Sequence, residues 1–167
     1  MWAAAAIAAA YVEPDPARII RAGLDQIPAK SRFQEDIGRI LALHADHADF
    51  ETAVEIIRTQ WDEKRGHDWC HTNSNAQLVA ATLLWHADNL GTALGAVVSC
   101  GFDTDCNGAT VGSILGIRNG IANLSPDWAA PVKDRITTGI AAYQTATLSA
   151  LSDEMAETAR DCGGLVK

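Results

Sequence analysis

Apolar residues recur at three- and four-residue spacing along most of the chain, which is the pattern of amphipathic helices. Asp15-Pro16 predicts a helix start, because aspartate caps a helix and proline fits its first turn. Ser31 and Gln34 form a capping box in front of the next helix. Further helices are predicted over residues 50–61, 73–84, 90–100 and 106–119.

The two ends of the chain follow other patterns. Residues 1–10 are mostly alanine and predict a helix that packs closely against its neighbours. This run lacks the basic residues of a signal peptide and is too short to span a bilayer. After a turn-rich connection over 125–131, two last helices are expected over 132–143 and 149–161, with Gly163-Gly164 as the stop. No strand alternation of any length is visible, so the predicted fold class is all-α, a compact helical bundle in which residues 1–167 form a single domain.

Length, net charge and cysteine content limit the size of the core, the kinds of partner and the location of the protein. The 167 residues, 48% of them hydrophobic, are enough for one packed core. With 21 acidic residues against 13 basic ones, the net charge of −8 repels phosphate backbones and anionic lipid, so neither nucleic acid nor a membrane is expected as a partner. The four cysteines form no C-x-x-C pair, which favours a reduced, cytoplasmic location.

The stretch CGFDTDCNGATVGS, residues 100–113, carries two carboxylates between two apolar helices. Asp103 and Asp105 are two residues apart, so in extended or turn backbone their side chains project to the same side. Carboxylate oxygens are ligands that Mg²⁺, Mn²⁺ and Ca²⁺ prefer. The alternative is that Asp105 caps the following helix, and local chemistry alone favours this ordinary role slightly.

Glycines recur at every fourth residue of the helix that follows. They are Gly108, Gly112, Gly116 and Gly120. Each interior glycine costs about 1 kcal/mol relative to alanine, so a ridge of them predicts that another helix or a ligand approaches the backbone closely. Close helix packing is the favoured explanation, and a bulky residue at Gly112 or Gly116 is expected to destabilise the fold.

Two groups of residues suggest metal sites by residue type alone. Residues 44–49, HADHAD, are better explained as the polar end of one helix and the cap of the next. A zinc site could in principle be assembled from two histidines and three cysteines, although their spacings match no zinc motif. These residues are His67, Cys70, His71, Cys100 and Cys106. His71 and Asn75 also stand at the start of a helix, where they either cap it or line a pocket.

Residues 101–116, GFDTDCNGATVGSILG, resemble the C-terminal signature of the ADP-ribosylglycohydrolases, in which the pattern is roughly G-G-D-T-D-T-N-A-A-x-x-G-A-x-x-G. The resemblance extends over most of the chain through shorter landmarks. These are Ile27-Pro28 with Ser31-Arg32-Phe33, the His71-x-x-x-Asn75 region and Pro126-Asp127-Trp128. The resemblance implies an all-α, orthogonal helical bundle.

The resemblance also implies an activity. Members of the family hydrolyse the glycosidic bond that links ADP-ribose to a modified side chain, using two Mg²⁺ or Mn²⁺ ions. ADP-ribosylated proteins or small molecules are therefore the implied substrates. The resemblance to the family signature implies that Asp103 and Asp105 are metal ligands. The implied substrate-binding residues are Thr104, Asn107, His71 and Asn75.

Two departures from the family pattern bear on this hypothesis. Cys106 stands where the family has a metal-ligating threonine, and a thiol is a poor partner for Mg²⁺, so either the thiol or a water fills this position. The family also carries a Ser/Thr-Asp-Asp run and a catalytic glutamate in its N-terminal half, whereas this chain has no Asp-Asp pair.

We therefore expect the chain to be the C-terminal part of a longer enzyme, holding half of the dimetal site and inactive alone. Self-association, or pairing with the missing N-terminal half, follows from the apolar face such a fragment would expose. The alternative is a non-catalytic helical module that binds a partner or ADP-ribose without hydrolysis.

Overall fold

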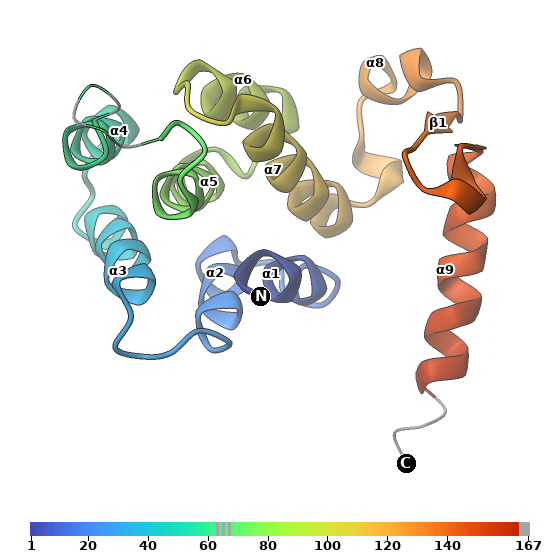
Figure 1. Cartoon of the computed structure of the whole chain (residues 1–167), viewed down its shortest axis with the longest axis horizontal. Coiled ribbons are helices and arrows are strands. Elements are labelled where there is room, and N and C mark those ends of the chain that lie inside the picture. The colour runs from blue at the N-terminus through green and yellow to red at the C-terminus, as the bar shows by residue number, and fades with distance from the viewer. Residues whose placement is uncertain (63, 65, 67, 164–167) are drawn as a thin grey trace. The chain divides into compact units, whose positions relative to one another are not determined.

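The computed structural model of the chain describes residues 1–62, 64, 66 and 68–163. They form two compact units, Met1–Asn123 and the residues from Leu124 onward. The predicted all-α class is confirmed, because helices make up most of the chain and the strands in the described ranges are two of two residues each (Figure 1). The prediction of a single domain over 1–167 stays a prediction.

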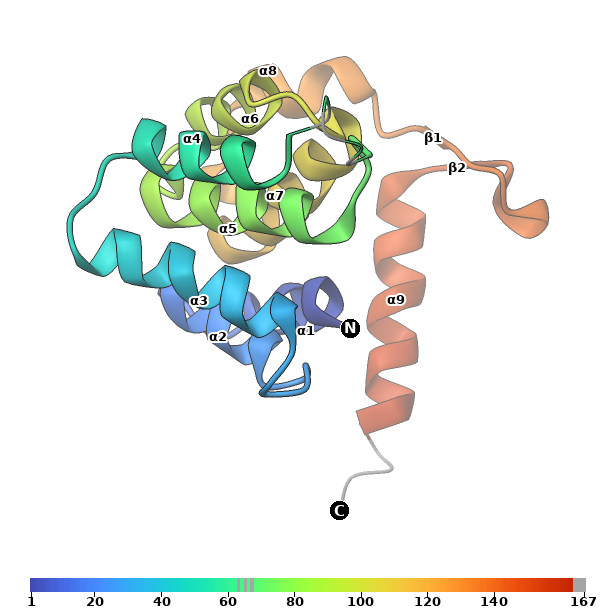
Figure 2. The same ribbon diagram turned by 60° about the vertical axis from the view of Figure 1, so that its left-hand side comes forward.

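The first unit is a bundle of helices arranged around α5. Its helices are α1 (Trp2–Ala9), α2 (Pro16–Leu24), α3 (Arg32–Ala45), α4 (Phe50–Gln60), α5 (Thr72–His86), α6 (Leu90–Ser99) and α7 (Thr104–Asn119), and a short 3-10 turn, Ile121–Asn123, follows. α5 packs against α2, α3, α4, α6 and α7, as Figures 1 and 2 show from two sides. Every residue from Ser74 to Leu83 is buried, which explains why this helix has apolar residues on all its faces.

Side-chain caps set the starts of the helices that the sequence predicts most clearly. Asp15 Oδ1 accepts a hydrogen bond from the Ala17 N–H at 2.9 Å, in front of α2. Ser31 Oγ accepts one from the Gln34 N–H at 3.2 Å, in front of α3. The Asp15 cap is confirmed, whereas only half of the capping box predicted for Ser31 and Gln34 forms. The Gln34 side chain donates to the Leu24 carbonyl at 2.6 Å, and the Ser31 N–H donates to the Pro28 carbonyl. Each cap satisfies an N–H group that the first turn of a helix leaves without a partner.

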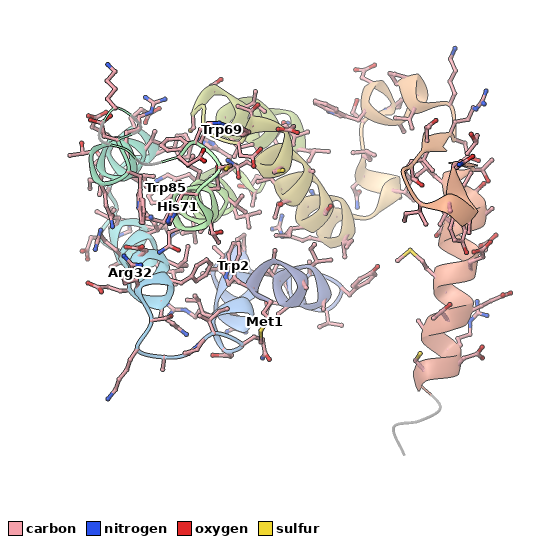
Figure 3. The ribbon with its side chains drawn as sticks, in the orientation of Figure 1. Met1, Trp2, Arg32, Trp69, His71 and Trp85 are labelled. Atoms are coloured by element: carbon pink, nitrogen blue, oxygen red, sulfur yellow. The ribbon has the colours of Figure 1, made fainter. Side chains whose placement is uncertain are left out.

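Trp2 of the alanine-rich α1 is buried in the bundle (Figure 3). Its indole N–H donates to the Ile20 carbonyl oxygen at 3.3 Å and so holds α1 in the core. Gly23 of α2 lies against this side chain. A Cβ at position 23 would lie 2.6 Å from Trp2 Cδ1 and 2.9 Å from the Trp2 carbonyl oxygen. Glycine at 23 therefore lets the two helices approach, and the alanines of α1 allow the same on its other faces.

The second unit contains α8 (Pro126–Ala129), the 3-10 turn Ala130–Val132, β1 (Ile136–Thr137), the 3-10 turn Ala141–Tyr143, β2 (Thr145–Ala146) and α9 (Leu148–Gly163). The helix predicted over 132–143 is wrong. β1 pairs antiparallel with β2, with Ile136 opposite Ala146 and Thr137 opposite Thr145.

The local backbone explains why no helix forms there. Lys133 and Asp134 both have a φ of 52°, which a right-handed helix does not accommodate. The Thr138 hydroxyl donates to the Tyr143 carbonyl at 2.7 Å and accepts from the Ile140 N–H at 3.0 Å. A threonine that bonds its neighbours' backbone in this way competes with the helical hydrogen-bond ladder.

The final helix is confirmed, and α9 extends the predicted 149–161 by a residue or two at each end. Asp134 supports its start, because its carboxylate accepts from the Ser149 N–H at 2.9 Å and from the Ser149 hydroxyl at 2.6 Å. Gly164 of the predicted stop lies outside the described residues. Among the helices described, none combines the length and the apolar character that crossing a bilayer requires.

Candidate metal and substrate site

The loop before α7 reverses the chain within three residues. Gly101 and Phe102 both lie in the left-handed region, with φ of 79° and 60°. Arg58 Nη2 donates to the Cys100 carbonyl at 3.0 Å, which ties this corner to α4. A phenylalanine at positive φ is strained, and such strain persists only where the surrounding structure holds it. The turn delivers Asp103 to the N-terminal end of α7.

Asp103, and not Asp105, is the residue that precedes α7. The alternative in which Asp105 caps the helix is therefore wrong, and α7 starts two residues earlier than predicted. The Asp103 side chain makes no capping hydrogen bond. Its carboxylate instead lies near Asp105, in the first turn of the helix, and near Cys106. One oxygen or sulfur atom from each of these three residues lies within 4.8 Å of the others. We call Asp103, Asp105 and Cys106 the Asp/Cys cluster.

The Cys106 thiol belongs to this cluster through Asp103. A hydrogen bond with the Asp103 carboxylate raises the pKa of the thiol, and the negative charges of Asp103 and Asp105 add to the effect. Cys106 is exposed. The cluster thus gathers negative charge at the end of a helix, where the positive end of the dipole favours it.

Asn75 of α5 connects this end of α7 to the rest of the bundle. Its Oδ1 accepts from the Asp103 N–H at 3.1 Å and from Asn107 Nδ2 at 2.7 Å. Its Nδ2 donates to the carbonyl oxygens of Trp69 and His71, both at 2.9 Å. A primary amide offers two donors and an oxygen with two lone pairs, so all four positions are used within the protein. Asn75 therefore positions the loop, and its predicted contact with substrate stays a prediction.

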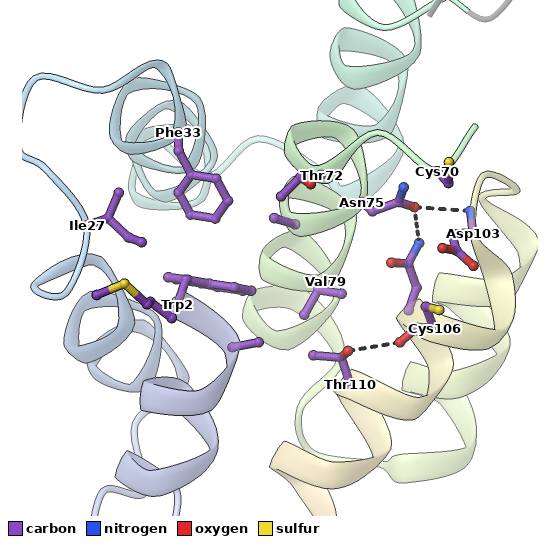
Figure 4. Close-up of a pocket in the computed structure, with 14 residues that line it drawn as sticks. Trp2, Ile27, Phe33, Cys70, Thr72, Asn75, Val79, Asp103, Cys106 and Thr110 are labelled. Atoms are coloured by element: carbon purple, nitrogen blue, oxygen red, sulfur yellow. Dashed lines mark hydrogen bonds between the residues drawn. The ribbon is translucent and has the colours of Figure 1, made fainter. Parts of the chain in front are cut away.

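A pocket of about 450 Å³ opens between α1, α5 and α7. One end is polar, formed by Asp103, Cys106 and Asn107, and the other end is apolar, formed by Trp2, Ile27 and Phe33 (Figure 4). Phe33 lies beside Trp2, with ring centroids 5.8 Å apart. The sequence pattern does not predict this apolar end, and its one local signal is the lone Trp2 in an alanine run.

The remaining predicted substrate residues divide between the pocket and its surroundings. Asn107 lines the pocket and is buried. Thr104 is the first residue of α7, where its N–H donates to the Phe102 carbonyl at 3.1 Å. His71 is not among the described lining residues. Its Nδ1 accepts from the Asn73 N–H at 3.2 Å and so caps α5, while its ring stacks on Trp61 at 4.3 Å.

The alternative metal sites are not assembled. Within residues 1–62, 64, 66 and 68–163, the Asp/Cys cluster is the one group of three or more potential ligands that lie together. His44 packs against the Trp85 ring at 4.8 Å, and Asp49 caps α4. Cys100 is buried, with its thiol donating to the Ala96 carbonyl at 3.2 Å, and His67 lies outside the described residues. The zinc site considered for these side chains is therefore not assembled among its described members.

The glycine ridge faces α6 along only part of its length. A Cβ at Gly108 would meet Val98 at 3.7 Å, and one at Gly112 would meet Leu94 at 3.8 Å, both ordinary contacts. At Gly116 nothing lies within 4 Å, so the expected close packing there is wrong. Gly120, with a φ of 70°, ends α7.

The family model of the ADP-ribosylglycohydrolases matches residues 1–163, which span both compact units. The chain belongs to the ADP-ribosylglycohydrolase family. Its function class is accordingly that of an ADP-ribosylglycohydrolase-like hydrolase. No curated protein and no solved structure gives a significant match to the chain.

The ADP-ribosylglycohydrolases depend on metal ions, and the Asp/Cys cluster lies within the matched residues. The two carboxylates fit the requirement of Mg²⁺ or Mn²⁺ for hard oxygen ligands. The Cys106 sulfur does not fit Mg²⁺, since thiolates select softer metals. The donor set therefore agrees with a divalent cation but only in part with magnesium.

Proposed function

We propose that this chain supplies the Asp/Cys cluster of a metal-dependent hydrolase that cleaves the glycosidic bond of ADP-ribosylated proteins or small molecules. The observation that carries the proposal is the convergence of Asp103, Asp105 and Cys106 in a chain of this family, with Asp103 and Cys106 lining one end of a pocket. The pocket also has room for part of a ligand beyond the reacting end. Its apolar wall offers burial to a ring or another apolar group.

The residues of the chain hold the reacting end in place. Asn75 fixes the Asp103 backbone, and the turn of α7 places Asp105 and Cys106 beside it. The bound cation would orient the ribose hydroxyls or a water and stabilise the charge that develops at the scissile bond. Asn107, through its side-chain amide oxygen, is the candidate for contact with the ribose. Thr104 is the candidate for holding the loop.

Three donors do not complete the coordination of Mg²⁺ or Mn²⁺, which take about six. Water, substrate or carboxylates of another polypeptide segment must therefore supply the rest. We infer that the chain by itself binds these ions weakly and turns substrate over at background rates, because removing ligands that act together removes most of the acceleration. A segment bearing the family's Ser/Thr-Asp-Asp run is the proposed partner, and pairing of two copies of this chain is the alternative.

Release of ADP-ribose from an ADP-ribosylated protein tests this function. The chain is assayed with Mg²⁺ or Mn²⁺, alone and mixed with a polypeptide that carries the Ser/Thr-Asp-Asp run. Release is expected only in the mixture and is expected to disappear with Asp103→Ala. Asp88→Ala, which removes an exposed carboxylate from the same unit, is the matched control. Binding of ADP-ribose without release in any mixture would contradict the hydrolase and favour a non-catalytic module.

A further inference from the structure

The sulfur in the Asp/Cys cluster changes which ion the cluster suits. Cys106 follows Asp103 by three residues, so the two side chains lie on one face at the start of α7. The Cys106 sulfur and one carboxylate oxygen from each of Asp103 and Asp105 lie within 4.8 Å of one another. Resting on the proposed function, we propose that the cluster takes a borderline divalent cation of the Zn²⁺ class, with Cys106 as a thiolate ligand beside Asp103 and Asp105.

The number of donors supports this assignment. Mg²⁺ prefers six oxygens in near-octahedral geometry, so at this cluster it would take most of them from water or other ligands and gain nothing from the sulfur. Three protein ligands and one water are the usual set of a catalytic zinc centre, which is tetrahedral and keeps an open position. The three side chains therefore match the number of protein ligands in a catalytic zinc centre, and the sulfur favours zinc over magnesium. Two carboxylates and one thiolate also bring enough negative charge to offset the cation.

The distances are compatible with such a centre. Zn–S bonds of about 2.3 Å and Zn–O bonds of about 2.1 Å at a tetrahedral angle place sulfur and oxygen roughly 3.6 Å apart. The ligand atoms of the cluster already lie within 4.8 Å of one another. Asp105 and Cys106 are exposed, so small rotations about their side-chain bonds suffice to close the difference.

The binding step is a ligand exchange. On binding, the S–H bond of Cys106 would break, a sulfur–metal bond would form, and the proton would pass to solvent. No electron is transferred, so no oxidant or reductant is needed. Each ion bound through the thiolate therefore releases one proton.

Cys70 provides the matched comparison. It lines the same pocket and is exposed, as Cys106 is, but its thiol is hydrogen-bonded with Asp68 and it is not a member of the cluster. Loss of the Cys70 sulfur should therefore leave metal binding intact. Loss of the Cys106 sulfur should remove the sulfur–metal bond.

The proposal is tested by titrating the whole chain with Co²⁺, the spectroscopic substitute for zinc. A phosphine reductant keeps the thiols reduced during the titration. The chain and its Cys70→Ser variant are expected to develop a thiolate-to-cobalt charge-transfer band in the near ultraviolet and the visible bands of a tetrahedral ion. Cys106→Ser and Cys106→Thr are expected to lose the charge-transfer band. Far-ultraviolet circular dichroism checks that every variant is folded.

Absence of the band in the unsubstituted chain, or its persistence in Cys106→Ser, would overturn the proposal. The outcome is separable from that of the proposed function. A chain that shows no cobalt–thiolate band, yet supports Mn²⁺-dependent release of ADP-ribose when paired, would refute only the thiolate site. A chain that shows the band but never supports release would refute only the hydrolase.

Discussion

Asn75 Oδ1 lies 2.7 Å from Asn107 Nδ2, and this buried hydrogen bond joins the central helix α5 to the helix that carries the Asp/Cys cluster. The same oxygen accepts from the backbone N–H of Asp103. The Asn75 side-chain amide therefore positions both α7 and the backbone of Asp103, which precedes it.

Asn75→Ala is expected to lower the free energy of unfolding by about 1–3 kcal/mol, because it leaves buried polar partners without hydrogen bonds. Asn107 is 3% exposed, so the variant deprives a buried amide of its acceptor. Chemical denaturation measures the change. Asn123→Ala, which removes an exposed side chain that bonds only the Asn119 carbonyl at 2.7 Å, should change the same quantity by much less. Equal effects for the two variants would show that the connection through Asn75 is unimportant.

Gly23→Ala and Gly116→Ala form a second matched pair. A methyl group at position 23 would lie 2.6–2.9 Å from Trp2 atoms, two of which belong to its ring and one to its backbone. We expect a loss of about 1–3 kcal/mol in unfolding free energy from this overpacking. At position 116 nothing lies within 4 Å, so alanine should raise helix propensity and stabilise by about 1 kcal/mol. In thermal unfolding, Gly23→Ala is expected to lower the melting temperature and Gly116→Ala to raise it.

The sequence pattern predicts features that depend on neighbouring residues but not those that depend on how helices pack. Caps such as Asp15 and Ser31 act over two or three residues, so the sequence predicts them correctly. The close approach of Trp2 to Gly23 depends on the packing of two helices and has no local signal. The glycine ridge misled for the same reason, since spacing does not reveal which part of α7 faces α6.

The candidate site likewise has features that neighbouring residues predict. Asp103, Asp105 and Cys106 are close in sequence, and their convergence was predictable from their spacing and from the family signature. The buried Asp36, which lies outside both the Asp/Cys cluster and the pocket, was not predicted. It lies 37 residues from Asn73, whose Nδ2 donates to it at 2.7 Å, and Gln60 Nε2 donates to it at 3.0 Å. Contacts of such separation are set by the fold, and neither residue type nor periodicity indicates them.

Asp49 gives a pH-dependent contribution to stability. Hydrogen bonds from the Thr52 hydroxyl and from its backbone N–H, the latter at 2.7 Å, lower the pKa of this carboxyl in the folded protein. Since the folded value lies below the unfolded value of about 3.9, the contribution is complete above that pH and is lost as the pH falls through the folded pKa. Asp49→Ala should therefore melt below the unsubstituted chain at pH 7, and the difference should narrow in acid. A gap that stays constant between pH 7 and strong acid would contradict this, and Asp46→Ala is the exposed control.

Removal of a carboxylate from the Asp/Cys cluster should separate stability from ion binding. Without a cation, Asp103→Asn is expected to leave the melting temperature unchanged or slightly raised, because it relieves repulsion between two carboxylates whose oxygens lie within 4.8 Å. The unsubstituted chain should melt at a higher temperature in millimolar Mn²⁺, since an ion that binds only the folded state stabilises it by mass action. This shift should be small, because three donors bind weakly, and it should disappear in Asp103→Asn while persisting in Asp88→Ala. An equal shift in all three proteins would mean that Mn²⁺ binds elsewhere, and the metal role of Asp103 would then fail.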